Sequence, residues 1–429
     1  MARTGRWGLL RAVAVFCAAA GLVTAGGQTA SADTVTSIRA TEWWLSAMHA
    51  PDLMWKTSTG KGITVAVIDS GVKANHPDLV GKVLPGKNFS ALSGGATSDV
   101  DGHGTGMASF IAGTGKGWDG KGMYGLAPDV KILPLRVVGK GSNEAVFSVS
   151  FAGQLSAAIR YAADSDAKIL NISMGQVENE PNVRSAVNYA IAKGKLVVAA
   201  VGNDGKSGDP VEYPAAFPGV VGVASDDKNA KIGTESEYGP QVAFAAPGEG
   251  MHRACTDPSG YCSSSGTSDA TAIFSASAAL VWAVHPDWTA NQLVRVLIDT
   301  ASTAGAVGVR DPHYGYGIVR PRDALAKPGD PGPGDVNPLL PVAASATPAP
   351  TTAAATPGAG APSTAPTTAA KQSGGSGLWI GVGAAVVVVL GAVLAFVLVR
   401  RRRRQGPPPP PPQAPYTPYG HIPDPYRQQ

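Results

Sequence analysis

Cysteine is scarce in this chain, with three in 429 residues. Cys17 lies in an apolar stretch near the N-terminus, whereas Cys255 and Cys262 share a loop rich in glycine and serine. No second cysteine pair lies near them, which disfavours the alternative of a zinc site. An isolated pair in an exported chain indicates a disulfide. We therefore expect a Cys255–Cys262 disulfide that braces the loop leading to Ser268.

An excess of positive charge is also missing from most of the chain, although the formal net charge is +4. Ten of the 35 basic residues, but only two of the 31 acidic residues, lie outside residues 33–330, so that stretch carries a net charge near −4. A domain that binds nucleic acid needs a basic surface. The charge distribution therefore argues against a nucleic-acid partner.

Long uncharged apolar runs are few, and the first lies near the N-terminus. Residues 1–32 have a charged start, an apolar segment at 12–25 and a small-residue cleavage site, Ala30-Ser31-Ala32. These are the three parts of a signal peptide. A retained membrane anchor is the alternative, which the shortness of the apolar segment disfavours.

The second uncharged run is residues 378–399, which are long enough to cross a bilayer as a helix. Residues 400–404 are all arginine, so the positive-inside rule places residues 400–429 in the cytoplasm and the preceding chain outside. Residues 328–377 are rich in Pro, Ala and Thr and are expected to form a flexible linker. The Pro-rich tail either docks a partner in an extended conformation or is disordered.

The remaining stretch, residues 33–327, alternates short apolar runs with helical patterns. This alternation predicts an α/β domain in which helices cover both faces of a parallel sheet. The expected strands are 63–68, 130–138, 167–172 and 196–201, with shorter ones at 220–224 and 242–245, and the expected helices include 147–163, 182–192 and 288–300. Residues after Ser268 form a run of small apolar residues that ends before Pro286, which predicts a buried helix.

Three polar residues in Gly-rich motifs stand at element ends: Asp69, His103 and Ser268. Alone, each has an ordinary explanation as a turn aspartate, a structural histidine or a helix N-cap. Together they supply a nucleophile, a general base and a carboxylate that orients the base, which is the chemistry of acyl transfer. Asn203, which follows an expected strand, offers an amide that could donate to the oxyanion.

These residues lie in motifs that resemble those of the subtilisin-like serine peptidases. The matching segments are VAVIDSGV around Asp69, HPDL at 76–79, DGHGTGMAS around His103, NISMG at 171–175, AAVGNDG around Asn203, AAPG at 245–248 and SSSGTS ending at Ser268. The resemblance covers about residues 40–326. It implies a three-layer fold with a seven-stranded parallel sheet, and it implies catalytic roles for Asp69, His103 and Ser268.

The same resemblance implies that Asn203 belongs to the oxyanion hole and that Ser173, Met174 and Gly175 line the pocket for a substrate side chain of a protein or peptide. Calcium sites are common in the family. The sequence has no compact carboxylate cluster to which an ion could be assigned, so we expect no metal and no cofactor.

The order of segments is similar to that of the mycosins, the membrane-anchored subtilases associated with type VII secretion. It implies a peptidase domain on the outer side of the cell membrane and contacts with secretion-complex subunits. A subtilase-fold scaffold that stabilises such a complex by contact is the alternative. A cell-wall amidase or esterase is a third possibility, since the same three residues can cleave other acyl bonds.

Three departures from the family pattern stand out. Ala272 occupies the position, four residues after Ser268, where the family usually has proline, and Asp269 places a carboxyl group directly beside the nucleophile. About thirty residues separate the expected cleavage site from the first strand, too few for the usual folded inhibitory propeptide. We expect Asp269 to alter the rate or the specificity.

Overall fold

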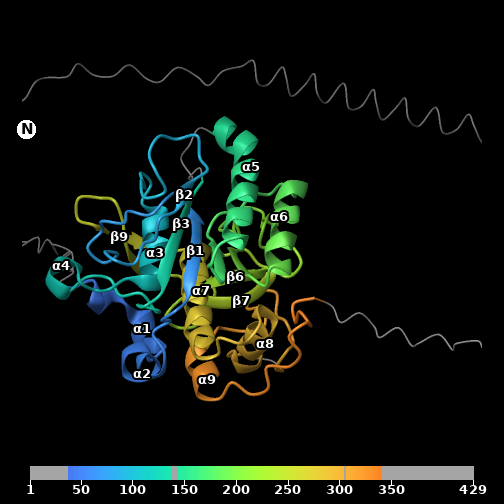
Figure 1. The fold of residues 1–429 in the computed structure, drawn as a ribbon. Coiled ribbons are helices and arrows are strands. Elements are labelled where there is room, and N and C mark those ends of the chain that lie inside the picture. The colour runs from blue at the N-terminus through green and yellow to red at the C-terminus, as the bar shows by residue number, and fades with distance from the viewer. Residues whose placement is uncertain (1–36, 138–143, 304–305, 341–429) are drawn as a thin grey trace, which may run out of the picture. The chain divides into compact units, whose positions relative to one another are not determined.

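The computed structural model describes residues 37–137, 144–303 and 306–340, and side chains other than those of residues 144–150. The expected signal peptide, membrane helix and tail, and all of the linker beyond residue 340, lie outside the described residues. The described chain forms three layers around a parallel sheet, as Figure 1 shows.

The central sheet has seven strands in the order β2-β3-β1-β4-β5-β6-β7, and all neighbouring pairs are parallel. This confirms the α/β fold and the strand number implied by the resemblance. The strands are β1 (Thr64–Asp69), β2 (Lys87–Asn88), β3 (Lys131–Arg136), β4 (Ile169–Ile172), β5 (Leu196–Ala200), β6 (Val221–Asp226) and β7 (Val242–Pro247). A separate antiparallel hairpin, β8 (Met251–Ala254) and β9 (Tyr261–Ser264), was not expected from the sequence.

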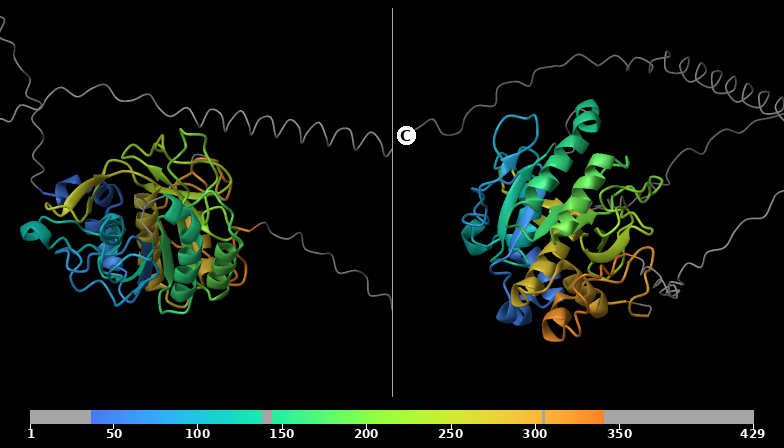
Figure 2. Two further views of the ribbon diagram at one scale, coloured as in Figure 1. Left: turned by 90° about the horizontal axis from the view of Figure 1, so that it is seen from above. Right: turned by 45° about the vertical axis from the view of Figure 1, so that its right-hand side comes forward.

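Helices cover both faces of this sheet, and Figure 2 shows them from two further sides. The principal ones are α3 (His103–Ala112), α5 (Glu144–Ala163), α6 (Pro181–Ala192), α7 (Thr267–Val284) and α8 (Ala290–Thr300). The shorter ones are η1 (Arg39–Thr41), α1 (Trp43–Ala47), η2 (Ala50–Met54), α2 (Trp55–Thr57), α4 (Gly117–Gly120) and α9 (Pro321–Ala326).

In β1 the side chains alternate between two hydrophobic clusters. Val65 and Val67 of β1 pack in the cluster that includes α3 and α7, whereas Ala66 and Ile68 pack in the cluster that includes α5 and α6. Burial on both faces explains why the strand reads as an unbroken apolar run in the sequence.

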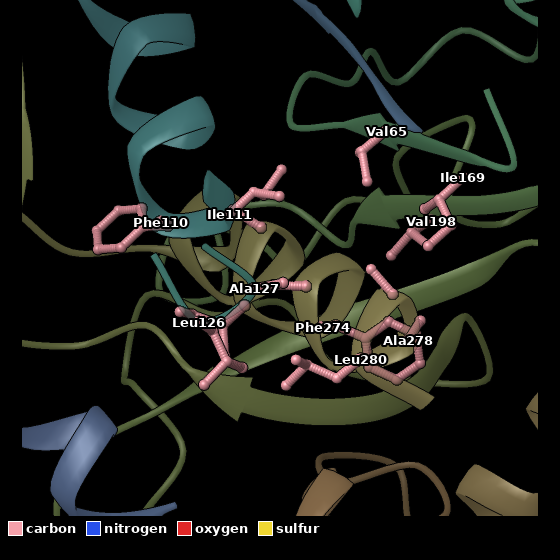
Figure 3. Packing of buried hydrophobic residues seen from close by; sticks show 14 of the residues in the cluster. Val65, Phe110, Ile111, Leu126, Ala127, Ile169, Val198, Phe274, Ala278 and Leu280 are labelled. Carbon is pink, nitrogen blue, oxygen red and sulfur yellow. The ribbon is translucent and has the colours of Figure 1, made fainter. Parts of the chain in front are cut away.

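Helix α7 runs through the centre of the first cluster. Figure 3 shows Phe274 and Ala278 of α7 near Val198 of the sheet. Within the described ranges, α7 is the one helix with the length and apolar composition to span a membrane, but 83% of it is buried inside the domain. Its many small residues let it lie close to the sheet, which confirms the expected buried helix and fixes its N-terminus beside the strand ends.

Residues 328–340, which their composition assigns to the linker, lie against α8. The Asn291 Nδ2 and Gln292 Nε2 atoms each donate a hydrogen bond of 2.9 Å, to the carbonyls of Gly334 and Gly332 respectively. Polar side chains at the start of α8 therefore hold this segment against the domain, and Leu339 packs against the first hydrophobic cluster.

Candidate active site

The fold brings three distant parts of the chain to the carboxyl edge of the sheet. Asp69 is the last residue of β1, His103 is the first residue of α3 and Ser268 is the second residue of α7. A pocket of about 350 Å³ at this edge is lined by His103, Ser268 and Asn203, among others. Parallel α/β sheets collect ligand chemistry at this edge because strands end and helices begin there.

Asp69 is buried and holds the imidazole of His103. The Nδ1 atom of His103 lies 2.8 Å from Asp69 Oδ1, and the backbone N–H of Ser70 donates to the same oxygen at 2.7 Å. Burial by itself would lower the pKa of His103, but the adjacent Asp69 carboxylate outweighs burial, so the pKa of the imidazole is raised. The bond at Nδ1 leaves Nε2 as the nitrogen that can accept a proton.

A second carboxylate, Asp99, shapes the loop that carries His103. Asp99 Oδ1 accepts hydrogen bonds from the backbone N–H of Gly102 (2.8 Å) and the hydroxyl of Ser70 (2.9 Å), and Oδ2 accepts one from the N–H of Thr105 (2.9 Å). The sequence does not mark this residue, because Asp99 lies outside the motifs around Asp69 and His103 and its contact with Ser70 joins positions 29 residues apart.

The Gly-rich motif around His103 has a steric cause. A Cβ atom at Gly104 would lie 2.1 Å from the carbonyl oxygen of Gly71, so any side chain there would push α3 away from β1. Gly104 therefore lets the start of α3 approach Asp69 closely enough for the hydrogen bond to His103.

The hydroxyl of Ser268 lies in the pocket and donates to the carbonyl of Ser173 at 3.1 Å, while the hydroxyl of Ser173 donates to the Ser268 carbonyl at 3.2 Å. No hydrogen bond joins Ser268 and His103 among the described residues, although both line the same pocket. Such bonds are often formed only when substrate binds.

Asn203 is fixed by α7. Its Oδ1 atom accepts hydrogen bonds from the backbone N–H of Thr267 (2.9 Å) and from the Thr267 hydroxyl (3.1 Å). Because an N–H donor requires the amide oxygen on that side, the Nδ2 group is left to donate elsewhere, and Asn203 lines the pocket. This orientation suits a donor for a developing oxyanion.

Ser173, Met174 and Gly175 follow β4 and line the same pocket, as expected. The next residue, Gln176, pairs with Tyr213 through backbone hydrogen bonds of 3.0 and 2.8 Å. This pairing brings Glu212 into the wall of the pocket. Glu212 lies in no motif, so the sequence alone does not mark it as a pocket residue.

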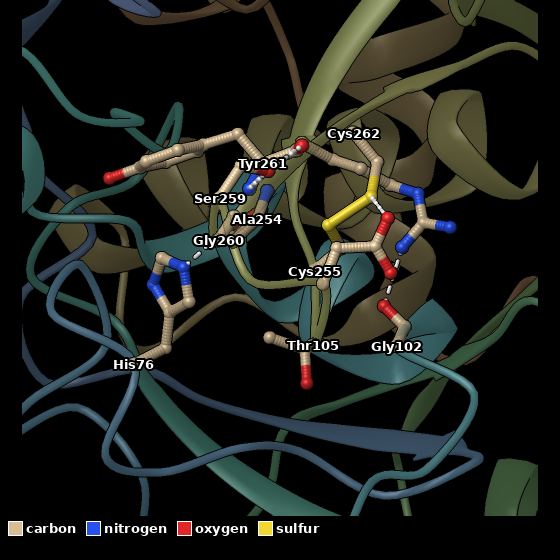
Figure 4. The surroundings of a disulfide bond; sticks show 12 residues. His76, Gly102, Thr105, Ala254, Cys255, Ser259, Gly260, Tyr261 and Cys262 are labelled. Carbon is tan, nitrogen blue, oxygen red and sulfur yellow. Dashed lines mark hydrogen bonds between the residues drawn. A yellow bond between two sulfur atoms is a disulfide. The ribbon is translucent and has the colours of Figure 1, made fainter. Parts of the chain in front are cut away.

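The loop that precedes α7 is tied by the expected disulfide, with Cys255 and Cys262 joined by an S–S bond of 2.08 Å between the ends of β8 and β9 (Figure 4). Arg253 of β8 donates through Nη1 to the carbonyl of Gly102, which links the hairpin to the loop that carries His103. The disulfide therefore braces a hairpin that contacts the loop carrying His103 and leads into helix α7.

Removal of this disulfide is expected to weaken the fold. Replacing both Cys255 and Cys262 by serine should lower the free energy of unfolding by about 2–3 kcal/mol, because the unfolded chain gains the freedom of an open loop. Urea unfolding of the variant and the parent measures the difference. Reducing agent should destabilise the parent and leave the variant unchanged, and equal stabilities without reductant would contradict the prediction.

Asp269 is almost fully buried and also lines the pocket. The Ser264 hydroxyl donates to its Oδ1 at 2.9 Å, and Oδ2 has no hydrogen-bond partner. Burial raises the pKa of Asp269 to about 7. The carboxyl group beside the nucleophile is therefore largely neutral in mild acid and becomes charged as the pH rises through neutrality.

Asp269→Asn is expected to change the rate without unfolding the domain. Above about pH 7 the parent carries a negative charge near the developing oxyanion and the variant does not, so kcat/KM of the variant should be about two- to fivefold higher. Below about pH 7 the kcat/KM values of the two proteins should approach each other. A raised folded-state pKa means that Asp269 costs stability as the pH rises, so the variant's Tm at pH 8 should be no lower than the parent's. Rates and melting curves from pH 5 to 9 measure both effects, and identical pH–rate profiles would contradict the prediction.

Comparison with known proteins agrees with this geometry. The sequence model of the Subtilase family matches residues 60–317. Thermitase of Thermoactinomyces vulgaris is 38% identical over 221 residues, which are 51% of this chain and 74% of that protein. The family match spans all the residues that line the pocket.

Solved structures with the same fold include two MycP proteins. MycP1 from Mycobacterium smegmatis aligns with a TM-score of 0.59 and 29% identity, over 68% of this chain and 86% of that one. MycP3 protease from the type VII (ESX-3) secretion system aligns with a TM-score of 0.58 and 30% identity, over 68% and 89% of the two chains. The family match, the relatives and the fold together show that the chain belongs to the subtilase family and is a subtilisin-like serine endopeptidase.

Proposed function

We propose that Ser268 is the nucleophile, His103 the general base and Asp69 the carboxylate that orients it, in an exported endopeptidase anchored in the cell membrane. The observation that carries the assignment is the 2.8 Å contact between His103 Nδ1 and the buried Asp69, at a pocket that Ser268 also lines. The substrate is a protein or peptide, and no cofactor takes part.

In the proposed reaction the Ser268 hydroxyl attacks the scissile carbonyl and its proton passes to Nε2 of His103. The Nδ2 group of Asn203 and the backbone N–H of Ser268, at the positive end of α7, stabilise the oxyanion. His103 then donates the proton to the leaving amine, and water repeats the sequence on the acyl-enzyme. Ser173, Met174 and Gly175 hold the substrate backbone and line the pocket for its side chain.

The test is covalent labelling of the purified protein with a fluorophosphonate. We expect one modified residue, Ser268, and loss of peptidase activity in proportion to labelling. Modification of a different serine, or full activity after Ser268 is labelled, would overturn the assignment.

The proposed layout is a signal peptide (1–32), a peptidase domain (33–327), a linker (328–377), a membrane helix (378–399) and a cytoplasmic tail (400–429). The disulfide supports export, because such bonds persist in oxidising compartments. The order of segments and the likeness to the MycP proteases support a link to type VII secretion. Protease added to intact cells should degrade residues 33–377 and spare an epitope fused after residue 429.

A subtilase-fold scaffold that stabilises a secretion complex by contact is the second candidate. It is favoured by the same likeness to MycP3, which is a protease from a type VII secretion system. A secretion defect in cells lacking the gene, restored by the Ser268→Ala protein, would support the scaffold; restoration by the unsubstituted protein alone would support proteolysis.

A further inference from the structure

Three carboxyl groups from different loops meet beside the wall of the catalytic pocket. One oxygen atom each from Asp204, Glu212 and Glu237 lies within 4.8 Å of the others. Asp204 follows Asn203, Glu212 lines the pocket and Glu237 precedes β7. These residues are up to 33 positions apart, so the sequence alone does not reveal the cluster.

Two glycines let these carboxyl groups lie directly against the backbone that lines the pocket. A Cβ atom at Gly175 would be 2.3 Å from Glu212 Oε2, and a Cβ atom at Gly202 would be 2.2 Å from Glu237 Oε1. Both glycines line the pocket. Any side chain at either position would displace a carboxyl group, so the two segments that flank the substrate site are built around the acids.

The buried member of the cluster, Glu237, lies among other acidic groups. Glu237 is fully buried, and its Oε2 atom has no hydrogen-bond partner. Burial, together with the nearby carboxylates of Glu212, Asp209 and Asp204, raises the pKa of Glu237 to about 8. Lys206, near in sequence, pairs instead with the exposed Glu235 at 2.5 Å.

Burial of a carboxyl oxygen without a hydrogen-bond partner destabilises the fold, because the oxygen loses its hydrogen bonds to water and no protein donor replaces them. A cation that enters from the pocket would compensate this loss of stability. The pocket has a volume of about 350 Å³ and reaches from Ser268 to Glu212, which is room for one long side chain.

We propose that this acid cluster binds the ammonium or guanidinium group of a substrate lysine or arginine, so that the enzyme cleaves after basic residues. The residue concerned is the one whose carbonyl Ser268 attacks, because its side chain leaves the backbone next to the Ser173–Gly175 wall. This inference rests on the proposed catalytic role of Ser268. Glu212 contacts the cation from the pocket wall, Asp204 supplies charge behind it, and the bound cation favours the ionised form of Glu237.

The first measurement compares peptides that differ only in the residue before the scissile bond: arginine, lysine, glutamine or methionine. We expect kcat/KM for arginine and lysine to exceed that for glutamine and methionine by about tenfold or more, since a charged hydrogen bond distinguishes them. High salt should reduce the difference, because Asp204 is exposed and Glu212 is only partly buried, so salt screens their charges.

The second measurement uses matched Glu→Gln exchanges. Glu212→Gln should lower kcat/KM for the arginine peptide by about tenfold and leave that for the methionine peptide unchanged. Glu237→Gln should act in the same direction. Glu235→Gln removes an exposed carboxylate two residues from Glu237 and should leave all four peptides unaffected.

The outcomes separate this inference from the proposed function. If the arginine and methionine peptides are cleaved equally while a fluorophosphonate still labels Ser268, the specificity inference is wrong and the catalytic assignment stands. If no peptide is cleaved and Ser268 is not labelled, the proposed function itself fails. Calcium binding in titration calorimetry that is lost in Glu212→Gln, without any preference for basic peptides, would show a metal site instead and overturn the inference.

Discussion

Ser268→Ala is expected to abolish peptide hydrolysis. In subtilisin, removing the serine or the histidine alone lowers kcat by about 10⁶-fold, and we expect a loss of that order here because the variant lacks the hydroxyl proposed to attack the substrate. KM should change little, since the Ser268 side chain contributes almost nothing to ground-state binding. Steady-state hydrolysis of a fluorogenic peptide measures the loss.

Folding has to be separated from chemistry in this experiment. The lost hydroxyl makes one hydrogen bond, to the Ser173 carbonyl, so the Tm should shift by only a few degrees. Ser46→Ala on the exposed face of α1 is the matched control and should keep full activity. A Ser268→Ala protein that melts like the parent and still cleaves the peptide would refute the nucleophile assignment.

The second large effect is expected for Asp69→Asn. The asparagine can donate to Nδ1 of His103, which moves the ring proton to Nε2, where it blocks acceptance of the Ser268 proton. For a serine protease triad this exchange costs about 10⁴-fold in kcat. The exchange keeps the volume of the side chain, so the loss reports the proton position rather than a cavity.

The pH dependence gives an independent check. The base must be neutral, so kcat/KM falls as the pH drops through the pKa of His103, which Asp69 raises. Removing the carboxylate removes the cause, so the acid limb of the residual activity should move to lower pH. Asp129→Asn, at an exposed carboxylate paired with Lys82 at 3.3 Å, should leave both rate and profile unchanged. An acid limb that stays in place would show that Asp69 does not control the base.

The sequence alone identified the chemistry of the chain. Asp69, His103 and Ser268 each lie where a buried strand ends or a helix begins, and local patterns reveal such positions because burial dictates composition. The same patterns predicted the buried helix α7 and every strand of the central sheet except β2, whereas the seven-stranded sheet was implied by the resemblance to the subtilisin-like peptidases. The disulfide followed from the scarcity of cysteine.

The tertiary structure alone decided what surrounds that chemistry. Asp99 supports the His103 loop, the Ser268 hydroxyl bonds to Ser173, and Glu212 and Glu237 meet beside the pocket. The Ser268–Ser173 and Glu212–Glu237 contacts join loops far apart along the chain, and a loop's path depends on the packing of the elements it connects. A carboxylate in an irregular segment has no periodicity, so its partners cannot be inferred before the fold brings them together.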